Sequence, residues 1–353
     1  MVNAEGPLSP PAQVDIRSGE VMSRAVAVVI PARDEEFRIG PTIAAMIAAP
    51  DVSEVVVVDD RSSDRTAAVS AGAGARVVTV GERPDNWAGK TWAVQRGVDA
   101  TTAPWVLVLD ADTRPDSGLP AALVARAIDD RLDLLTVAGS FRAGRRSSRW
   151  LHAAMLATLV YRYGPPGTGG RVLANGQCML LRRDGFQGRG GMSIVAGSLV
   201  EDVALARSTG ALGGRVAFVD ASDLLEVEPY ESFGATWSGW GRSLGLPGVD
   251  PVTRRVLDVV VLALVMPWPI VRLLGGRGDA IDLAAIAARV GTLVGMRPAY
   301  RARGASYWLS PLADPVAITS LAIGVVKRRR SWRGRTYWSR GATAAQPART
   351  ADR

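Results

Sequence analysis

The sequence contains very little cysteine, histidine and lysine. Its 353 residues include one cysteine, Cys178, and one histidine, His152, and only two of its 42 basic residues are lysines, Lys90 and Lys327. A single cysteine excludes an internal disulfide and any metal site built from several cysteines. Cys178 and His152 both lie in apolar runs, GQCMLL and WLHAAMLATLV, so we expect a buried structural thiol and a core or interfacial histidine.

Other signatures are missing as well. The first 23 residues are polar and contain prolines, without the apolar segment of a signal peptide, so we expect the catalytic part to stay in the cytosol. No helix-turn-helix, zinc or ribonucleoprotein pattern accompanies the net charge of +8, which disfavours nucleic acid as a partner. No strand-like run is followed by G-x-G-x-x-G, which disfavours a dinucleotide-binding domain.

Short β-branched runs alternate with helical stretches from Ala25 onward. The expected strands cover residues 25–30, 54–58, 75–80 and 105–109, and the expected helices lie near 39–49, 62–71, 88–99 and 119–128. Continuous apolar strands separated by helices predict an α/β fold with a mostly parallel sheet flanked by helices. Ligands of such sheets bind beyond the carboxyl ends of the strands.

Acidic clusters follow the expected strands at this edge. They are PARDEE (31–36), DDRSSDRT (59–66) and DADTRPD (110–116). Asp110 and Asp112 stand two residues apart, so on an extended chain their carboxylates point the same way and repel each other. A divalent cation shared with a diphosphate would relieve that repulsion. The alternative is a strand-end turn that happens to hold two acids, and helix capping explains residues 62–64.

Two further features suggest chemistry. In a chain whose usual cation is arginine, Lys90 in GK at a helix start indicates a compact ammonium that reaches a phosphate or a base. Glu201 and Asp202 lie in the first turn of the helix expected over residues 198–208. Acids in a first helical turn are also favoured by the helix dipole alone.

The C-terminal part turns apolar. Val256–Leu274 is long enough to span a bilayer, residues 281–296 carry Arg289, and residues 305–326 precede the basic run KRRRSWRGRTYWSR. Such a basic run is typical of contact with anionic lipids. Positive-inside reasoning favours two crossings with the Arg289 segment at the interface. Amphipathic helices lying on the membrane are the alternative.

Six motifs occur in order between residues 25 and 210: VVIPARDEE, VVVVDDRSSDRT, GKTWAVQRG, LVLDADT, NGQCMLLRR and EDVALA. This set resembles the inverting family 2 glycosyltransferases of the GT-A fold. NWAGKTWA, SGWGRSLG, the hydrophobic tail and WRGRTY are similar to bacterial membrane glycosyltransferases of carotenoid and hopanoid biosynthesis. The implied organisation is a polar tail (1–23), a GT-A catalytic domain (24–245), a membrane-associated helical region (246–340) and a disordered tail (341–353).

The resemblance assigns residues to a nucleotide-sugar donor. The nucleotide side comprises Pro31, Ala32, Asp34 and Glu35 near the ribose and Asp59 or Asp60 at the base. The diphosphate-sugar side comprises Lys90, Asp110, Ala111, Gly176, Gln177, Trp240 and Arg242, with Asp110 and Asp112 as metal ligands. Asp202 is the expected general base, with Glu201 orienting it. The family's Q-x-x-R-W order is absent, which leaves the roles of Trp240 and Arg242 open.

The expected activity is the transfer of a sugar from a nucleotide diphosphate, UDP-linked, to a lipid hydroxyl of the carotenoid or polyprenoid class. It implies Mg²⁺ or Mn²⁺ as cofactor and a place at the cell membrane with the catalytic domain cytoplasmic. The alternatives are a polyprenyl-phosphate sugar synthase and an inactive membrane scaffold of the same fold. A sugar nucleotidyltransferase is disfavoured because its glycine-rich first loop is missing.

Overall fold

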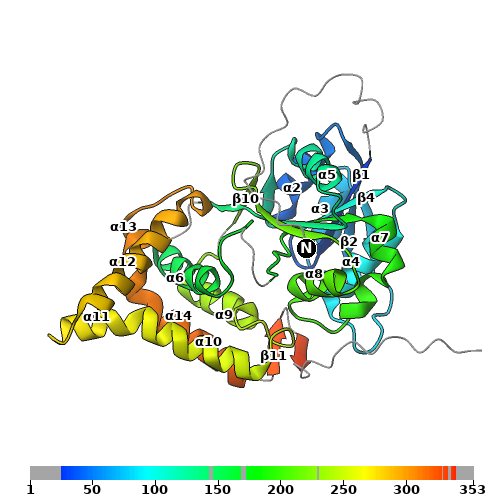
Figure 1. The fold of residues 1–353 in the computed structure, drawn as a ribbon. Coiled ribbons are helices and arrows are strands. Elements are labelled where there is room, and N and C mark those ends of the chain that lie inside the picture. Colours follow the sequence, from blue (N-terminus) through cyan, green and yellow to red (C-terminus); the bar gives the residue numbers. More distant parts are fainter. Residues whose placement is uncertain are drawn as a thin grey trace, which may run out of the picture.

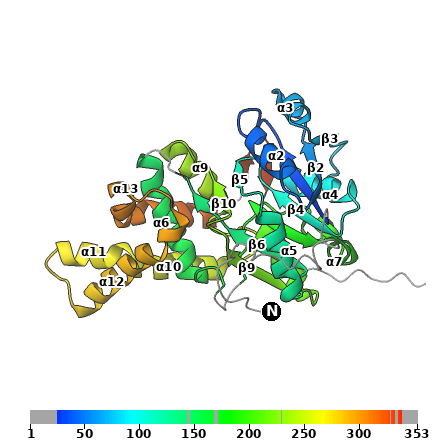
Figure 2. The ribbon, with the colours of Figure 1, turned by 90° about the horizontal axis from the view of Figure 1, so that it is seen from above.

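The computed structural model describes residues 25–142, 146–167, 172–228, 230–327, 329–332 and 335–338. The predicted tails at 1–23 and 341–353 lie outside the described residues. The described chain forms a sheet covered by helices and a second group of helices beside it, as two perpendicular views show (Figure 1, Figure 2).

The central sheet has seven strands in the order β3-β2-β1-β4-β8-β6-β9. Their bounds are β1 (Val26–Ala32), β2 (Val52–Asp59), β3 (Arg76–Thr79), β4 (Trp105–Leu109), β6 (Leu134–Ala138), β8 (Cys178–Arg182) and β9 (Val216–Asp220). The pairs of β1 with β2 and β4, of β2 with β3 and of β6 with β9 are parallel. In this sheet β8 runs against its two neighbours. The predicted mostly parallel sheet is therefore confirmed.

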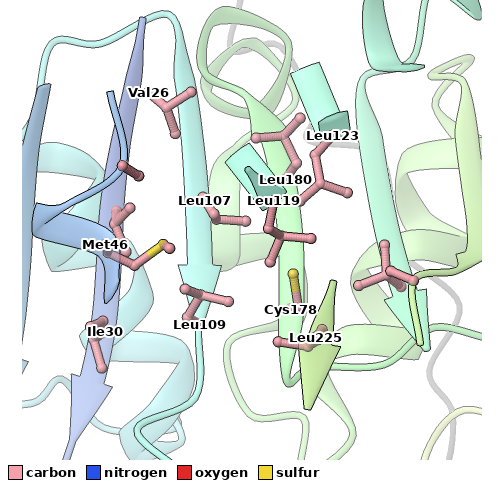
Figure 3. Close-up of a cluster of buried hydrophobic side chains, with 14 of the residues drawn as sticks. Val26, Ile30, Met46, Leu107, Leu109, Leu119, Leu123, Cys178, Leu180 and Leu225 are labelled. Carbon is pink, nitrogen blue, oxygen red and sulfur yellow. The ribbon is translucent and has the colours of Figure 1, made fainter. Parts of the chain in front are cut away.

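Helices cover both faces of this sheet. On one face α2 (Ile39–Ile47) and α5 (Leu119–Asp129) pack against side chains such as Ile30, Leu109 and Cys178 (Figure 3). On the other face lie α4 (Gly89–Asp99), α7 (Arg183–Gly188) and α8 (Glu201–Ala211). Burial on both faces explains why β1, β2 and β4 are continuous apolar runs rather than alternating ones. Of these helices, α2, α4, α5 and α8 form where the sequence predicts them, as does α3 (Thr66–Gly72), whereas α7 was not predicted. Cys178 is buried as expected.

The reversed direction of β8 matters for the site. Cys178, the first residue of β8, pairs with Leu109, the last residue of β4. The next N–H, that of Asp110, donates to the carbonyl of Gln177 over 3.0 Å. The residues that precede β8 therefore lie at the same edge of the sheet as the residues that follow β4.

A small sheet adjoins that edge. It contains β5 (Thr113–Pro115), β10 (Leu225–Val227) and β7 (Ser140–Phe141), in the order β5-β10-β7. Beyond β10, the N–H of Glu228 donates to the carbonyl of Asp112 over 3.2 Å. This hydrogen bond thus fixes the backbone of Asp112, two residues after Asp110.

The second group of helices, here called the helical unit, has its own apolar core. It comprises α6 (Arg146–Tyr163), α9 (Phe233–Ser243), α10 (Val252–Val265), α11 (Pro267–Leu274), α12 (Ala280–Gly295), α13 (Ala305–Trp308) and α14 (Asp314–Val326). Short 3₁₀ turns cover Gly191–Val195, Arg297–Ala299 and Ser310–Ala313, and a hairpin of β11 (Arg329–Trp332) and β12 (Arg335–Trp338) follows. Both α6 and α9 pack against α14, although they precede the predicted domain boundary at residue 245.

The long helix pair α10–α11 buries charged side chains and exposes apolar ones. Val252–Leu274 is long and apolar enough to cross a membrane, and 22% of its most apolar 18-residue stretch is buried inside the protein. Its inward stripe includes the buried Arg255 and Asp258, whereas Leu257 and Val261 are about half exposed. The number of crossings stays a prediction.

The charge of Arg289 is neutralised within the helical unit. Its guanidinium donates two hydrogen bonds of 2.8 Å to the carboxylate of Asp314, so α12 is joined to α14. Both side chains are almost fully buried. Arg289, whose charge made residues 281–296 unsuitable for a bilayer centre, is thus paired with Asp314 inside the protein.

Candidate active site

Lys90 stands at the centre of the site. It is the second residue of α4, and its Nζ lies 2.7 Å from Asp110 Oδ1 and 3.0 Å from Glu201 Oε1. The same ammonium donates to the carbonyl of Gly176 over 3.2 Å. One cation therefore links the end of β4, the loop before β8 and the start of α8.

The carboxylate of Asp202 has a defined position. Its Oδ2 accepts the N–H of Gly176 over 2.8 Å and its Oδ1 accepts the N–H of Val203 over 2.8 Å. A Cβ added at Gly176 would lie 3.2 Å from Asp202 Cβ, from Glu201 Oε1 and from Lys90 Nζ. Gly176 is therefore packed closely against Lys90, Glu201 and Asp202. The sequence alone does not predict this contact.

The balance of burial and neighbouring charges raises the pKa values of Asp202, Asp110 and Lys90 in this cluster. Burial, aided by the neighbouring charge of Glu201, raises the pKa of Asp202 to about 7. Burial likewise raises the pKa of Asp110 to about 6, although Lys90 opposes the shift. Burial alone would lower the pKa of Lys90, but the carboxylates of Asp110 and Glu201 outweigh it and raise that pKa, so Lys90 stays charged. A carboxylate with a pKa near neutrality suits a general base.

Asp112 completes the donor side. Burial raises its pKa, and the charges of Arg38 and Lys90 oppose that shift. Among the described residues, no group of three or more histidine, cysteine or acidic side chains could hold a metal ion. Two carboxylates, Asp110 and Asp112, fit a divalent ion that takes its remaining oxygen ligands from a substrate diphosphate. They do not form a closed protein cage.

The predicted nucleotide side gathers at the ends of β1 and β2. The N–H of Asp34 donates to Ser62 Oγ over 3.0 Å, and the N–H of Ser63 donates to Asp34 Oδ1 over 2.8 Å. The N–H of Glu35 donates to Thr66 Oγ1 over 2.7 Å. The two loops are therefore hydrogen-bonded to each other, and Asp34 uses its N–H and its Oδ1 in this contact.

The two aspartates that end β2 are buried beside β1. The N–H of Asp60 donates to the carbonyl of Ala32 over 2.8 Å, and Asp59 pairs in register with Ala32 as Val58 does with Pro31. Because β1, β2 and β4 are neighbours, these residues share one edge of the sheet with Asp110 and Ala111.

In α9, Trp240 packs inside the helical unit rather than at this edge of the sheet. Trp240 packs against His152, with ring centroids 4.8 Å apart, inside the helical unit. His152 itself is buried, and its Nδ1 lies 2.7 Å from the hydroxyl of Tyr300, in agreement with the predicted core histidine. Burial lowers the pKa of His152 to about 3, so its ring is neutral.

One residue near the site, Tyr230, belongs to none of the six sequence motifs. Tyr230 lies between Asp112 and α9, where the charges of Arg242, Asp112 and Asp110 act on its phenol. It opens the aromatic-rich segment YESFGATWSGWGRSLG, which was the available signal.

Comparisons with solved structures give low similarity. A glucosyl-3-phosphoglycerate synthase from Mycobacterium tuberculosis, in complex with Mn²⁺, UDP and glucosyl-3-phosphoglycerate, is 24% identical. The match covers 60% of this chain and 76% of that chain, with a TM-score of 0.41. The same enzyme with phosphoglyceric acid matches at 25% identity over 56% of this chain and 70% of that chain, with a TM-score of 0.40.

Curated relatives are more similar over shorter segments. An uncharacterised glycosyltransferase of Mycobacterium tuberculosis is 39% identical over 140 residues, which are 38% of this chain and 57% of the relative. A 4,4'-diaponeurosporenoate glycosyltransferase of Staphylococcus haemolyticus is 35% identical over 98 residues, which are 27% of this chain and 26% of the relative. The match thus spans between about a quarter and just over half of these relatives.

The family comparison identifies the catalytic part. Residues 27–188 match the model of glycosyl transferase family 2. This segment contains most of β1 and all of β2 to β8, with Lys90, Asp110, Asp112 and Gly176, whereas Glu201 and Asp202 lie beyond it. The family match and the observed sheet agree with the predicted GT-A fold. Residues 27–188 of this chain are therefore similar to a glycosyl transferase family 2 domain.

Proposed function

We propose that this protein transfers a sugar from a UDP-linked donor to the hydroxyl of a membrane lipid of the carotenoid or polyprenoid class, with inversion at the anomeric carbon. The observation that carries the proposal is the junction of Lys90 with Asp110 on the donor side and with Glu201 on the acceptor side. This junction supports a site where a departing diphosphate and an attacking hydroxyl meet.

On the donor side, the chain offers a cation and two carboxylates. Lys90 would bind a phosphate oxygen as a point charge. Asp110 and Asp112 would hold Mg²⁺ or Mn²⁺, which when bound supplies positive charge that stabilises the leaving nucleotide diphosphate. The loops after β1 and β2 would bind the ribose and the base through Pro31, Ala32, Asp34, Glu35 and Asp59 or Asp60.

On the acceptor side, Asp202 would act as the general base. The acceptor oxygen forms a bond to the anomeric carbon, the bond from that carbon to the diphosphate breaks, and the hydroxyl proton passes to the Asp202 carboxylate. The two N–H groups of Gly176 and Val203 hold this carboxylate in place. Glu201, through Lys90, keeps the base near the donor side.

The helical unit supports a lipid acceptor. From Val256 to Leu274 the large exposed side chains are apolar, among them Leu257, Val261, Leu264 and Trp268. An exposed apolar surface of this length is typical of a membrane contact. One relative is named for a diaponeurosporenoate acceptor, and we extend a lipid acceptor of that kind to this chain. The catalytic domain would then lie on the cytoplasmic face of the cell membrane.

The test is a transfer assay in membranes that carry the full chain. Membranes are incubated with a panel of radiolabelled sugar nucleotides and Mg²⁺ or Mn²⁺, and the lipids are extracted and counted. We expect one UDP-sugar to label a lipid, and Asp112→Ala to abolish the labelling. Asp116→Asn is the matched control, because that carboxylate of the same loop only caps the N–H of Gly118 in the structure.

Two outcomes would overturn the proposal. If no donor labels any lipid, the lipid acceptor is wrong. If labelling is obtained but Asp202→Asn leaves its rate within about threefold of the parent, no strong base is required, and the acceptor is a phosphate, as in a polyprenyl-phosphate sugar synthase.

A further inference from the structure

Tyr230 occupies a position that neither the family match nor the motifs assign. It follows β10 in the segment that leads into α9, and thus joins the sheet edge to the helical unit. Two hydrogen bonds fix this segment. The N–H of Glu228 donates to the Asp112 carbonyl over 3.2 Å, and Ser148 Oγ on α6 donates to the Tyr230 carbonyl over 2.5 Å.

The ring of Tyr230 lies on a glycine of α9. A Cβ added at Gly239 would collide with the Cζ, hydroxyl and Cε1 atoms of the ring. Only a residue without a side chain leaves room for the phenol tip at this point of the helix. Gly239 is helical and has ordinary backbone angles, so the steric fit rather than backbone freedom explains glycine here.

The hydroxyl of Tyr230 is available to a ligand. The residue is 38% exposed, and within the described part of the chain its hydroxyl has no hydrogen-bond partner. Burial raises the pKa of the phenol, so it remains an O–H donor at neutral pH. The charges of Arg242, Asp112, Asp110 and Lys90 all act on the pKa of this phenol.

We propose that Tyr230 is a further donor-binding residue, whose hydroxyl donates a hydrogen bond to the diphosphate of the sugar nucleotide, and that Gly239 exists to let the ring reach it. The segment of Tyr230 is hydrogen-bonded to the Asp112 carbonyl through Glu228, and the charges of the donor side act on the phenol, so a diphosphate bound beside Asp112 would lie near it. This inference rests on the proposed function, because it presumes a nucleoside diphosphate bound beside Asp112.

The test measures UDP binding to the full chain in detergent, by titration calorimetry in the presence of Mn²⁺. We expect Tyr230→Phe to weaken binding about tenfold or more, since it removes one hydrogen bond to a charged group. Tyr161→Phe is the matched control, because it removes the same atom from a buried hydroxyl that has no partner among the described residues.

A second pair of variants tests the role of the glycine. Gly239→Ala should weaken UDP binding as Tyr230→Phe does, whereas Gly234→Ala should not, since nothing lies within 4 Å of a Cβ at that position of the same helix. Thermal unfolding of each variant separates loss of fold from loss of binding, and Tyr230→Phe keeps the test valid if Gly239→Ala unfolds.

The results separate the two proposals. If the parent protein does not bind UDP, the proposed function fails. If the parent binds UDP and Tyr230→Phe binds it equally well, only the role of Tyr230 is overturned. A donor KM that rises with unchanged kcat would agree with a contact made equally before and during transfer.

Discussion

Lys90 Nζ lies 2.7 Å from Asp110 Oδ1, although 20 positions separate the two residues and each belongs to a different element. The pair neutralises the first of the two aspartates that follow β4. It also gives a reason for lysine at this position in a chain whose basic residues are nearly all arginine, because a compact ammonium can contact Asp110, Glu201 and the Gly176 carbonyl at once.

Replacement of this ammonium should inactivate the enzyme. We expect Lys90→Met to lower kcat at least 100-fold, since a charged donor aimed at the leaving group is lost. The other lysine supplies the control, because Lys327 is exposed at the end of α14 and Lys327→Met should leave kcat unchanged. Transfer of labelled sugar to lipid provides the measurement, and a Lys90→Met rate within threefold of the parent would contradict the role.

The reaction should depend on pH through Asp202. Its carboxylate must be unprotonated to accept a proton, and its pKa is raised to about 7. Below that value log(kcat/KM) should therefore rise with pH, by up to one unit per pH unit, and level off above it. The measurement is kcat/KM from pH 5 to 9 at fixed metal concentration. Residual activity of Asp202→Asn should lack this limb, and a parent profile that falls from pH 5 to 7 would exclude the base.

Crowding at Gly176 offers a gentler perturbation. Gly176→Ala would bring a methyl group to 3.2 Å from Lys90, Glu201 and Asp202 at once, so we expect kcat to fall by about 10- to 100-fold. Gly40→Ala, in α2 with nothing within 4 Å, is the control and should retain the parent rate. Equal rates for the two variants would show that the cluster tolerates displacement.

The buried ion pair between α12 and α14 should matter for stability rather than for chemistry. Arg289→Met leaves Asp314 buried without its partner, which should lower the free energy of unfolding by about 3–5 kcal/mol. The double variant Arg289→Met/Asp314→Leu should recover most of that loss. Denaturant unfolding in detergent measures both. A double variant as unstable as the single one would show that the pair itself, rather than the uncompensated charge, is required.

The exposed face of α10 should govern membrane contact. Leu257→Glu/Val261→Glu places two charges on a surface that is otherwise apolar, so the protein should shift from the membrane pellet to the soluble fraction. UDP binding should stay unchanged, since α10 contributes no residue to the donor site. Leu212→Glu is the control, because Leu212 is 55% exposed at the end of α8 in the catalytic domain. Membrane retention of the double variant would locate the contact elsewhere.

The sequence predicts the parts of the fold that depend on local patterns. Runs such as WVLVL and EVVVV can only be stable when buried on both faces, so β2 and β4 and the helices between them follow from the sequence. The acids after each strand are equally visible, because parallel strands bring their carboxyl ends to one edge.

The rest depends on contacts between distant residues. The direction of β8 is decided by its pairing with β4 and β6, which no pattern within residues 178–182 encodes. The same holds for the pairing of Arg289 with Asp314, which turns a charge that looks exposed into a buried one. Tyr230 was missed because its place over Gly239 requires knowing how α9 docks.

The reversed strand β8 also has a consequence for biosynthesis. Strands β1 to β4 are complete once residue 109 has been made, and they pair with one another within that segment. The Asp110 contact with Gln177, in contrast, needs a residue made 67 positions later, and Asp202 follows later still. During synthesis from the N-terminus, a folded half-sheet therefore precedes the site. A nascent chain therefore lacks Glu201 beside Lys90, and the neighbouring Asp202, until α8 has emerged from the ribosome.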